Sequence, residues 1–291
     1  MTPAASAMPL DGPVDGPLAG QTVLVTGSSS GIGEATARRL AEIPNAELVL
    51  VARREQRLQA LTDSLGECAS FLAVDLLEEE APRRILTHLQ ERHGRLDLLV
   101  NNAGAAWRAT FAKGGYENVK RTMDINFDAQ VRLTEALLEL LRTSAPSAIV
   151  NVASTAGRVA RAGSGAYSAS KFAFAGWSDS LWAEERPHGV HVGLVLPGFI
   201  STEGFPQAEL TARALTRWIV STPEKAAEAI FQAGVERRAE RYVPRPYALA
   251  AALRVIAPGL VRRVLGGGAA QVMTTTTGAD TAEGVEPPSA A

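Results

Sequence analysis

The sequence predicts a three-layer α/β fold in which helices cover both faces of a doubly wound parallel sheet. Three observations support this prediction. Six short apolar runs alternate along the chain with longer segments of helical periodicity. None of these runs alternates apolar and polar residues, which is typical of strands that are buried on both faces. A glycine-rich turn joins the first run directly to the first helical segment.

The predicted strands are short and rich in Val, Leu and Ile. They span residues 22–26, 48–52, 71–74, 98–101, 148–153 and 190–196. Helical patterns occupy residues 33–42, 55–65, 79–92, 119–142 and 166–185. Strand–helix repetition at this spacing implies βαβ units with right-handed crossovers, and hence a Rossmann-type sheet.

The chain of 291 residues contains enough apolar material for one large core. We expect a single folded domain over residues 20–245. Residues 1–19 contain four prolines among small residues, and we expect them to form a flexible leader. Residues 246–265 read as a basic amphipathic extension, which Pro258 should break into two short helices. Residues 266–291 read as a disordered acidic tail.

Composition excludes several classes of function. The formal net charge is −2, which argues against bulk attraction to nucleic acid. Cys68 is the only cysteine and the four histidines lack metal-ligand spacing, so we expect no disulfide and no metal site. No apolar run reaches about 18 residues, and the first residues do not resemble a secretory signal. We therefore expect a cytoplasmic protein.

The turn after the first predicted strand reads Thr-Gly-Ser-Ser-Ser-Gly-Ile-Gly over residues 26–33. Gly27, Gly31 and Gly33 allow the backbone to turn tightly and to approach a diphosphate closely. The helix that follows offers free N–H groups and the positive end of its dipole. A glycine-rich stretch alone is often only a turn, but this position between strand and helix predicts a dinucleotide-binding site.

Polar residues stand at further strand ends and helix positions of the predicted fold. The sequence Asn-Asn-Ala-Gly follows the fourth strand at residues 101–104, and Ser154 follows the fifth. Asn126 lies in the helical segment before the fifth strand. Tyr167 and Lys171 are four residues apart in the next helical pattern, so they share one helix face. An ammonium beside a phenol lowers the tyrosine pKa from about 10, which suits proton transfer.

Together, the T-G-x-x-x-G-x-G turn, the N-N-A-G element and the Asn, Ser and Y-x-x-x-K positions resemble the short-chain dehydrogenase/reductase family, in its branch of compact single-domain enzymes. The resemblance covers about residues 20–245 and implies that this segment is a dinucleotide-binding and catalytic domain. It implies hydride transfer between a nicotinamide cofactor and a ketone, an aldehyde or a secondary alcohol.

The resemblance also implies a catalytic tetrad of Asn126, Ser154, Tyr167 and Lys171. Tyr167 is expected to act as general acid or base. Lys171 is expected to lower the pKa of Tyr167 and to hold the nicotinamide ribose. Ser154 is expected to donate a hydrogen bond to the substrate oxygen. Asn126 is expected to hold a water that links Lys171 to solvent.

The second predicted strand is followed by Arg53, where an acidic residue would select NAD. A guanidinium suits the 2′-phosphate of NADP, so we expect NADP (NADPH) rather than NAD. The alternative is that Arg53 opens a solvated helix. Asp75 is expected to bind the adenine amino group, or alternatively to cap a helix. The full set of expected cofactor contacts is Gly27, Ser29, Ser30, Gly31, Ile32, Gly33, Arg53, Asp75, Leu76, Asn102, Ala103, Gly104, Tyr167, Lys171, Pro197, Gly198, Ile200 and Thr202.

Two connections at the carboxyl ends of the strands, residues 105–116 and 199–218, are expected to shape the substrate pocket. Their aromatic residues favour an apolar pocket and a hydrophobic carbonyl or alcohol substrate. They are Trp107, Phe111, Phe199, Phe205 and Trp218. The family resemblance implies a homodimer or homotetramer through helices 119–142 and 166–185. For residues 246–265 we favour packing within the protein or against a second subunit over contact with a membrane surface.

Three alternatives stay open at this stage. One is an epimerase or dehydratase of the extended branch, although the turn spacing differs and no larger C-terminal region follows. The second is a nucleotide-sensing regulator without catalysis, although such proteins often lose the catalytic tyrosine or lysine. The third is a peripheral membrane protein on the same fold.

Overall fold

The computed structural model describes residues 21–201 and 220–266. Its centre is a seven-stranded, fully parallel sheet in the order β3-β2-β1-β4-β5-β6-β9. This order confirms the doubly wound prediction, and the chain changes direction across the sheet between β1 and β4. The strands are β1 Thr22–Thr26, β2 Glu47–Ala52, β3 Ala69–Ala73, β4 Leu98–Asn101, β5 Ser147–Val152, β6 Val190–Pro197 and β9 Glu240–Val243.

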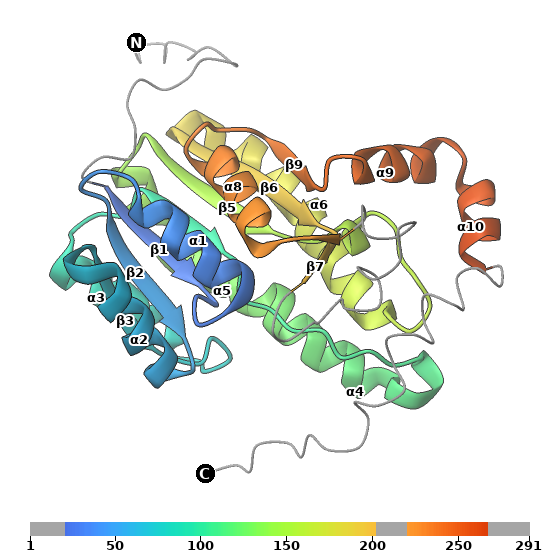
Figure 1. The fold of residues 1–291 in the computed structure, drawn as a ribbon, viewed down its shortest axis with the longest axis horizontal. Helices are drawn as coiled ribbons and strands as arrows, with labels where there is room; N and C mark the ends of the chain where they lie inside the picture. The colour runs from blue at the N-terminus through green and yellow to red at the C-terminus, as the bar shows by residue number, and fades with distance from the viewer. Residues whose placement is uncertain (1–20, 202–219, 267–291) are drawn as a thin grey trace, which may run out of the picture.

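Helices cover both faces of the sheet (Figure 1). On one face pack α1 Gly31–Ala41, α2 Glu55–Leu65 and α8 Pro223–Gly234. On the other face pack α3 Ala81–Arg92, α5 Ala129–Thr143 and α6 Gly165–Glu185. The remaining helices are α4 Phe111–Met123, α9 Tyr247–Ile256 and α10 Pro258–Gly266. Short helical turns are η1 Gly66–Cys68, η2 Asp124–Asp128, η3 Thr155–Gly157 and η4 Arg186–His188.

The central strand β1 shows why the strand sequences are continuously apolar. Val23 and Val25 pack under α1 and α8, whereas Leu24 between them packs under α3 and α5. All three side chains are fully buried. Successive side chains of a strand point to opposite faces, so both faces of this sheet require apolar residues.

Several elements differ from the sequence-based prediction. Residues 119–142 are helical throughout, as expected, but the helical stretch begins earlier, at Phe111, and the π-helical turn η2 lies between α4 and α5. Residues 105–116 are not wholly a connection, since α4 begins at Phe111. The prediction also missed α8 and β9. A second, two-stranded sheet pairs β7 Phe199–Ile200 with β8 Val220–Ser221.

A buried amide network joins the layers directly below the carboxyl end of the sheet. The Asn101 Nδ2 donates to Asn151 Oδ1 and to Thr134 Oγ1, both at 2.9 Å. The Asn151 Nδ2 in turn donates to Ser178 Oγ at 2.9 Å. The network therefore links β4 and β5 to α5 and α6 through side chains that are shielded from water.

The C-terminal extension forms two short helices, as the Pro258 break predicted. They project away from the sheet (Figure 1), and their packing within the described protein covers only part of their apolar surface. The exposed large apolar side chains of this segment are Leu249, Leu253, Val255, Ile256, Leu260 and Val264. Among the described residues, no helix has both the length and the apolar character needed to cross a bilayer.

Candidate active site

The β1–α1 turn forms a cradle that only glycine fits. Gly27 and Gly31 adopt positive φ angles of 67° and 58°, which favour glycine. A Cβ at Gly33 would overlap the carbonyl oxygen of Gly27 and would lie 2.7 Å from Asn102 Nδ2. Ser30 precedes α1 without a side-chain cap, so no capping side chain satisfies the first N–H groups of this helix. These features fit a diphosphate at the helix N-terminus.

Hydrogen bonds connect the end of β4 to this cradle. Thr26 Oγ1 accepts hydrogen bonds from the backbone N–H groups of Asn102 at 2.9 Å and Ala103 at 3.0 Å. The Asn102 Nδ2 donates to the carbonyl of Thr26 at 2.9 Å. The N-N-A-G element therefore holds the two loops on either side of the strand switch at a fixed separation.

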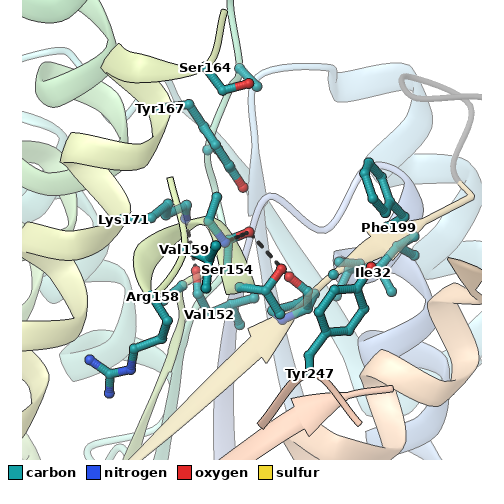
Figure 2. A pocket seen from close by; sticks show the side chains of 18 of the residues that line it. Ile32, Val152, Ser154, Arg158, Val159, Ser164, Tyr167, Lys171, Phe199 and Tyr247 are labelled. Carbon is teal, nitrogen blue, oxygen red and sulfur yellow. Dashed lines mark hydrogen bonds between the residues drawn. The ribbon is translucent and has the colours of Figure 1, made fainter. Parts of the chain in front are cut away.

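Ser154, Tyr167 and Lys171 meet above the end of β5 (Figure 2). The Tyr167 hydroxyl faces Ser154, which acts to lower the pKa of that phenol. Ser154 Oγ also contacts the carbonyl of Pro197 at 3.2 Å and accepts from Ala156 N at 3.1 Å. Lys171 is only 4% exposed, and its Nζ donates to the carbonyl of Val152 at 2.9 Å. The helix α6 thus presents phenol and ammonium on one face, as their four-residue spacing predicted.

Burial controls the protonation of this cluster. Burial raises the pKa of Tyr167 and outweighs Ser154 and the nearby Arg161 and Arg108 charges, which act to lower it. The net shift is upward, so the lowering by Lys171 expected from the sequence is not what the free protein shows. Burial lowers the pKa of Lys171 to about 8. At neutral pH, Tyr167 is therefore a protonated acid and most Lys171 side chains keep their charge.

Asn126 lies fully buried in the π-helical turn η2. Its Oδ1 accepts from the N–H of Ala105 at 2.8 Å, and its Nδ2 donates to the carbonyl of Ala105 at 2.9 Å and to Ser170 Oγ at 3.0 Å. A Cβ at Gly104 would lie 2.8 Å from Asn126 Oδ1 and 3.6 Å from Lys171 Nζ. Asn126 therefore ties the loop after β4 to α6 beside the buried ammonium.

Most of the expected cofactor and catalytic residues line one cavity of about 650 Å³. It extends from the cradle to Ser154 and Tyr167. The expected residues that line it are Gly27, Ser30, Gly31, Ile32, Gly33, Asn102, Ala103, Gly104, Ser154, Tyr167, Lys171, Pro197, Gly198 and Ile200. Thr202 lies outside the described residues.

The residues expected to bind the adenosine half of the cofactor lie outside this cavity. The Arg53 side chain is 72% exposed, with its Nη1 at 3.8 Å from Asp75 Oδ2. Asp75 Oδ1 accepts from the N–H of Leu77 at 3.0 Å, so it caps a turn several residues before α3. Leu76 is buried in the core between the sheet and α3.

Sequence reasoning missed Arg54, which contacts the cradle directly. Its Nη2 donates to Ser29 Oγ at 3.0 Å and to Ser30 Oγ at 2.7 Å. The sequence signal was present in the Arg53-Arg54 pair, but the orientation of each side chain follows from the turn after β2. Ser29 therefore faces Arg54 and does not line the cavity.

The substrate side of the cavity is less aromatic than expected. Trp107 and Phe111 are 37% and 75% exposed and do not line it, so these two expectations are wrong. Phe205 and Trp218 lie outside the described residues. Phe199 lines the cavity, and so does Tyr247, which the sequence reasoning missed. Tyr247 packs so closely on Gly198 that a Cβ there would overlap its ring.

A glycine cradle at the strand switch, opening onto Ser, Tyr and Lys, defines a nicotinamide-dependent oxidoreductase. Residues 21–212 match the family model described as short chain dehydrogenase. The chain belongs to this short-chain dehydrogenase/reductase family, whose members use nicotinamide cofactors.

Several relatives are named as reductases. A ketoacyl reductase of Nostoc sp. is 32% identical over 220 residues, which are 74% of this chain and 76% of the relative. The 3-oxoacyl-[acyl-carrier-protein] reductase of Vibrio cholerae is 34% identical over 186 residues, covering 64% of this chain and 76% of the relative. The 3-dehydrosphinganine reductase of Danio rerio is 30% identical over 241 residues, covering 78% and 72%.

Replacing Gly33 by Ala should weaken binding of the reduced nicotinamide cofactor at least about ten-fold, which corresponds to about 1.4 kcal/mol. The added methyl group must displace the Gly27 carbonyl from its position in the cradle. Nicotinamide fluorescence measures the affinity, and circular dichroism checks folding. Gly176→Ala is the matched control, because a Cβ there enters open space. Equal affinity for this cofactor in both folded variants would contradict the cradle assignment.

Proposed function

We propose that this enzyme reduces a ketone or aldehyde with NADPH, or oxidises the matching secondary alcohol with NADP. The observation that carries the proposal is the convergence of the glycine cradle and the Ser154–Tyr167–Lys171 cluster on one cavity. The reductases among the relatives favour the reductive direction for this chain. The proposed substrate has an apolar part, because Ile32, Val159 and Phe199 contribute to the cavity wall.

When bound, the nicotinamide supplies the hydride that reaches the carbonyl carbon. Tyr167 gives its hydroxyl proton to the carbonyl oxygen, and Ser154 donates a hydrogen bond to that oxygen as its charge develops. The Lys171 ammonium stabilises the tyrosinate that remains, because an opposite charge nearby favours the ionised form. Lys171 also holds the nicotinamide ribose hydroxyls. Asn126 holds the loop after β4 against α6 through its hydrogen bonds to Ala105 and Ser170. It also holds the water through which Lys171 exchanges protons with solvent.

The preference for NADPH rests on two adjacent arginines at the end of β2. Arg54 donates hydrogen bonds to Ser29 and Ser30 of the cradle. Arg53 extends toward Asp75 with an exposed guanidinium. Both offer positive charge where an acidic residue would bind the 2′-hydroxyl of NAD. A guanidinium provides paired donors that match a phosphate. Asp75 receives the adenine, next to Leu76, whose side chain is buried in the core. Thr202 completes the contacts to the nicotinamide.

Replacing Tyr167 by Phe should lower kcat by about 10²- to 10⁴-fold, since the variant has no proton to donate. NADPH affinity should stay near that of the wild type because the ring is retained. Carbonyl-dependent oxidation of NADPH is followed by absorbance, and binding by fluorescence. The exposed Tyr116→Phe serves as the control. Undiminished turnover of the Tyr167→Phe variant would refute the mechanism, and a wild-type protein that binds nucleotide without turning over any carbonyl compound would favour a regulator.

The wild-type protein should bind NADPH more tightly than NADH. Arg53→Ala and Arg54→Ala should each weaken NADPH binding about ten-fold or more and leave NADH binding nearly unchanged. Parallel fluorescence titrations provide the measurement, and Arg83→Ala on α3 is the control for loss of an exposed arginine. Tighter binding of NADH by the wild type would overturn the proposed cofactor.

We propose that the enzyme assembles as a homodimer or homotetramer through α4–α5 and α6. Phe172 and Trp182 on α6 expose apolar surface that fits such a contact. The division into leader, domain, extension and tail and the cytoplasmic location remain predictions from the sequence.

For the extension α9–α10 we propose contact with an anionic lipid surface. Its exposed apolar side chains lie in a segment, residues 247–266, that carries Arg254, Arg262 and Arg263 and no acidic residue. Self-association through this segment would bring arginines together, whereas anionic headgroups complement them. The exposed apolar side chains support lipid contact over the packing within the protein or against a second subunit that the sequence favoured.

The full chain should sediment with vesicles of phosphatidylcholine and phosphatidylglycerol and not with phosphatidylcholine alone. The double variant Leu249→Ser, Ile256→Ser should lose this binding, because burial of apolar area drives it. Leu77→Ser, which alters an exposed leucine elsewhere, is the control. Absence of sedimentation, with a dimer that the double variant abolishes in size-exclusion chromatography, would assign the segment to a second copy.

A further inference from the structure

Two arginines from separate segments meet on the substrate side of the cavity. Arg108 lies between β4 and α4, and Arg161 lies between η3 and α6. Both line the cavity together with Tyr167. Both charges act to lower the pKa of Tyr167, and the charge of Arg161 adds to burial in lowering the pKa of Arg108. The fold therefore holds two like charges near each other and near the phenol.

Among the described residues, no acidic side chain offsets the charge of Arg161. Its guanidinium lies 4.5 Å from the ring centroid of Phe199, and burial lowers its pKa. Within residues 21–201 and 220–266, no carboxylate forms an ion pair with it. Arg158, which also lines the cavity, differs: it pairs with Glu240 at 3.0 Å, and Figure 2 shows it directed away from Ser154 and Tyr167. Arg161 is partly buried, and arginines withdrawn from water are normally paired, so a bound anion would complete its surroundings.

We propose that Arg108 and Arg161 form an oxyanion subsite, which binds a carboxylate or phosphate group of the substrate at a distance from the reacting carbonyl. The inference rests on the proposed carbonyl reduction. Guanidinium groups match the geometry of both oxyanions, and the partial burial of Arg161 strengthens the attraction. Val159, Phe199 and Tyr247 supply the apolar remainder of the wall. The substrate class is therefore a keto acid or keto phosphate with an apolar chain, which is narrower than the hydrophobic carbonyl expected from the sequence.

A competing role for the pair is to adjust the pKa of Tyr167 alone. That role acts on every substrate equally and moves the pH profile of the reaction. A subsite acts through KM and only on substrates that carry the anion. Charged and neutral forms of one carbonyl compound therefore separate the two roles.

The test compares acetoacetate, levulinate and the next two longer straight-chain methyl ketone carboxylates, each beside its methyl ester. With NADPH saturating, kcat/KM of the wild type should favour at least one carboxylate over its ester by about ten-fold or more. Arg161→Gln and Arg108→Gln should each remove most of this preference through KM. Arg161→Lys should retain part of it, and the exposed Arg186→Gln should retain all of it. NADPH affinity and circular dichroism confirm that each variant is folded and binds cofactor.

Acetate and inorganic phosphate, tested as inhibitors of ester reduction, distinguish the two oxyanions. Competitive inhibition by either one that is lost in Arg161→Gln supports the subsite and identifies its preferred anion. Ester reduction without carboxylate preference and without such inhibition overturns the subsite and leaves the proposed function intact. An altered pH profile with equal loss on acids and esters assigns the pair to Tyr167 alone and also overturns it.

If no ester or acid is reduced, the proposed function fails for these substrates and binding decides the subsite. Calorimetric titration with levulinate and with phosphate then compares the wild type with Arg161→Gln. Binding that the variant loses supports the subsite, and equal or absent binding overturns it.

Discussion

The hydrogen bond from the buried Lys171 ammonium to the carbonyl of Val152 is the contact on which the site depends. It joins α6 to the end of β5, and so it sets Tyr167 on the helix against Ser154 beyond the strand. Gly157 strengthens this junction, because a Cβ there would overlap the backbone carbonyl of Lys171. A lysine that is withdrawn from water at this point costs free energy, which the packing of the sheet and helices must offset. A buried charge of this kind is typical of functional sites.

The second constraint is the strand switch between β1 and β4. Thr26 and Asn102 hold the two loops together, and the glycines of the cradle let the backbones approach where a Cβ would overlap neighbouring atoms. The cradle and the Ser–Tyr–Lys cluster belong to different βαβ units, yet both open onto one cavity because all strands are parallel and end at one edge. The buried Asn101–Asn151 network below this edge holds β4 and β5 against α5 and α6 through side-chain hydrogen bonds.

Much of this arrangement could be predicted from local patterns. Continuous apolar runs indicated doubly covered strands, the glycine turn indicated the cradle, and the spacing of Tyr167 and Lys171 indicated a shared helix face. The edge strand β9 was missed, since its sequence Glu-Arg-Tyr-Val buries only Val243 fully. The π-helical turn η2 was missed because its apolar periodicity continues that of the helices on either side.

The remaining features depend on contacts between distant segments. Neighbouring side chains Arg53 and Arg54 take different directions from one turn, which the dipeptide alone does not reveal. Arg108, Arg161 and Tyr247 come from three separate segments and meet only in the folded chain. No pattern within a single segment indicates that these arginines approach the Tyr167 phenol. The sequence therefore predicted an aromatic pocket, whereas the cavity wall is both apolar and basic.

A crystal structure of the protein with NADPH bound tests the central claim most directly. We expect the diphosphate on the N–H groups at the start of α1, the 2′-phosphate at Arg53 and Arg54, and the nicotinamide beside Tyr167, with its ribose on Lys171. A nicotinamide bound away from Tyr167, or a cofactor that leaves the cradle empty, would overturn this assignment of the site.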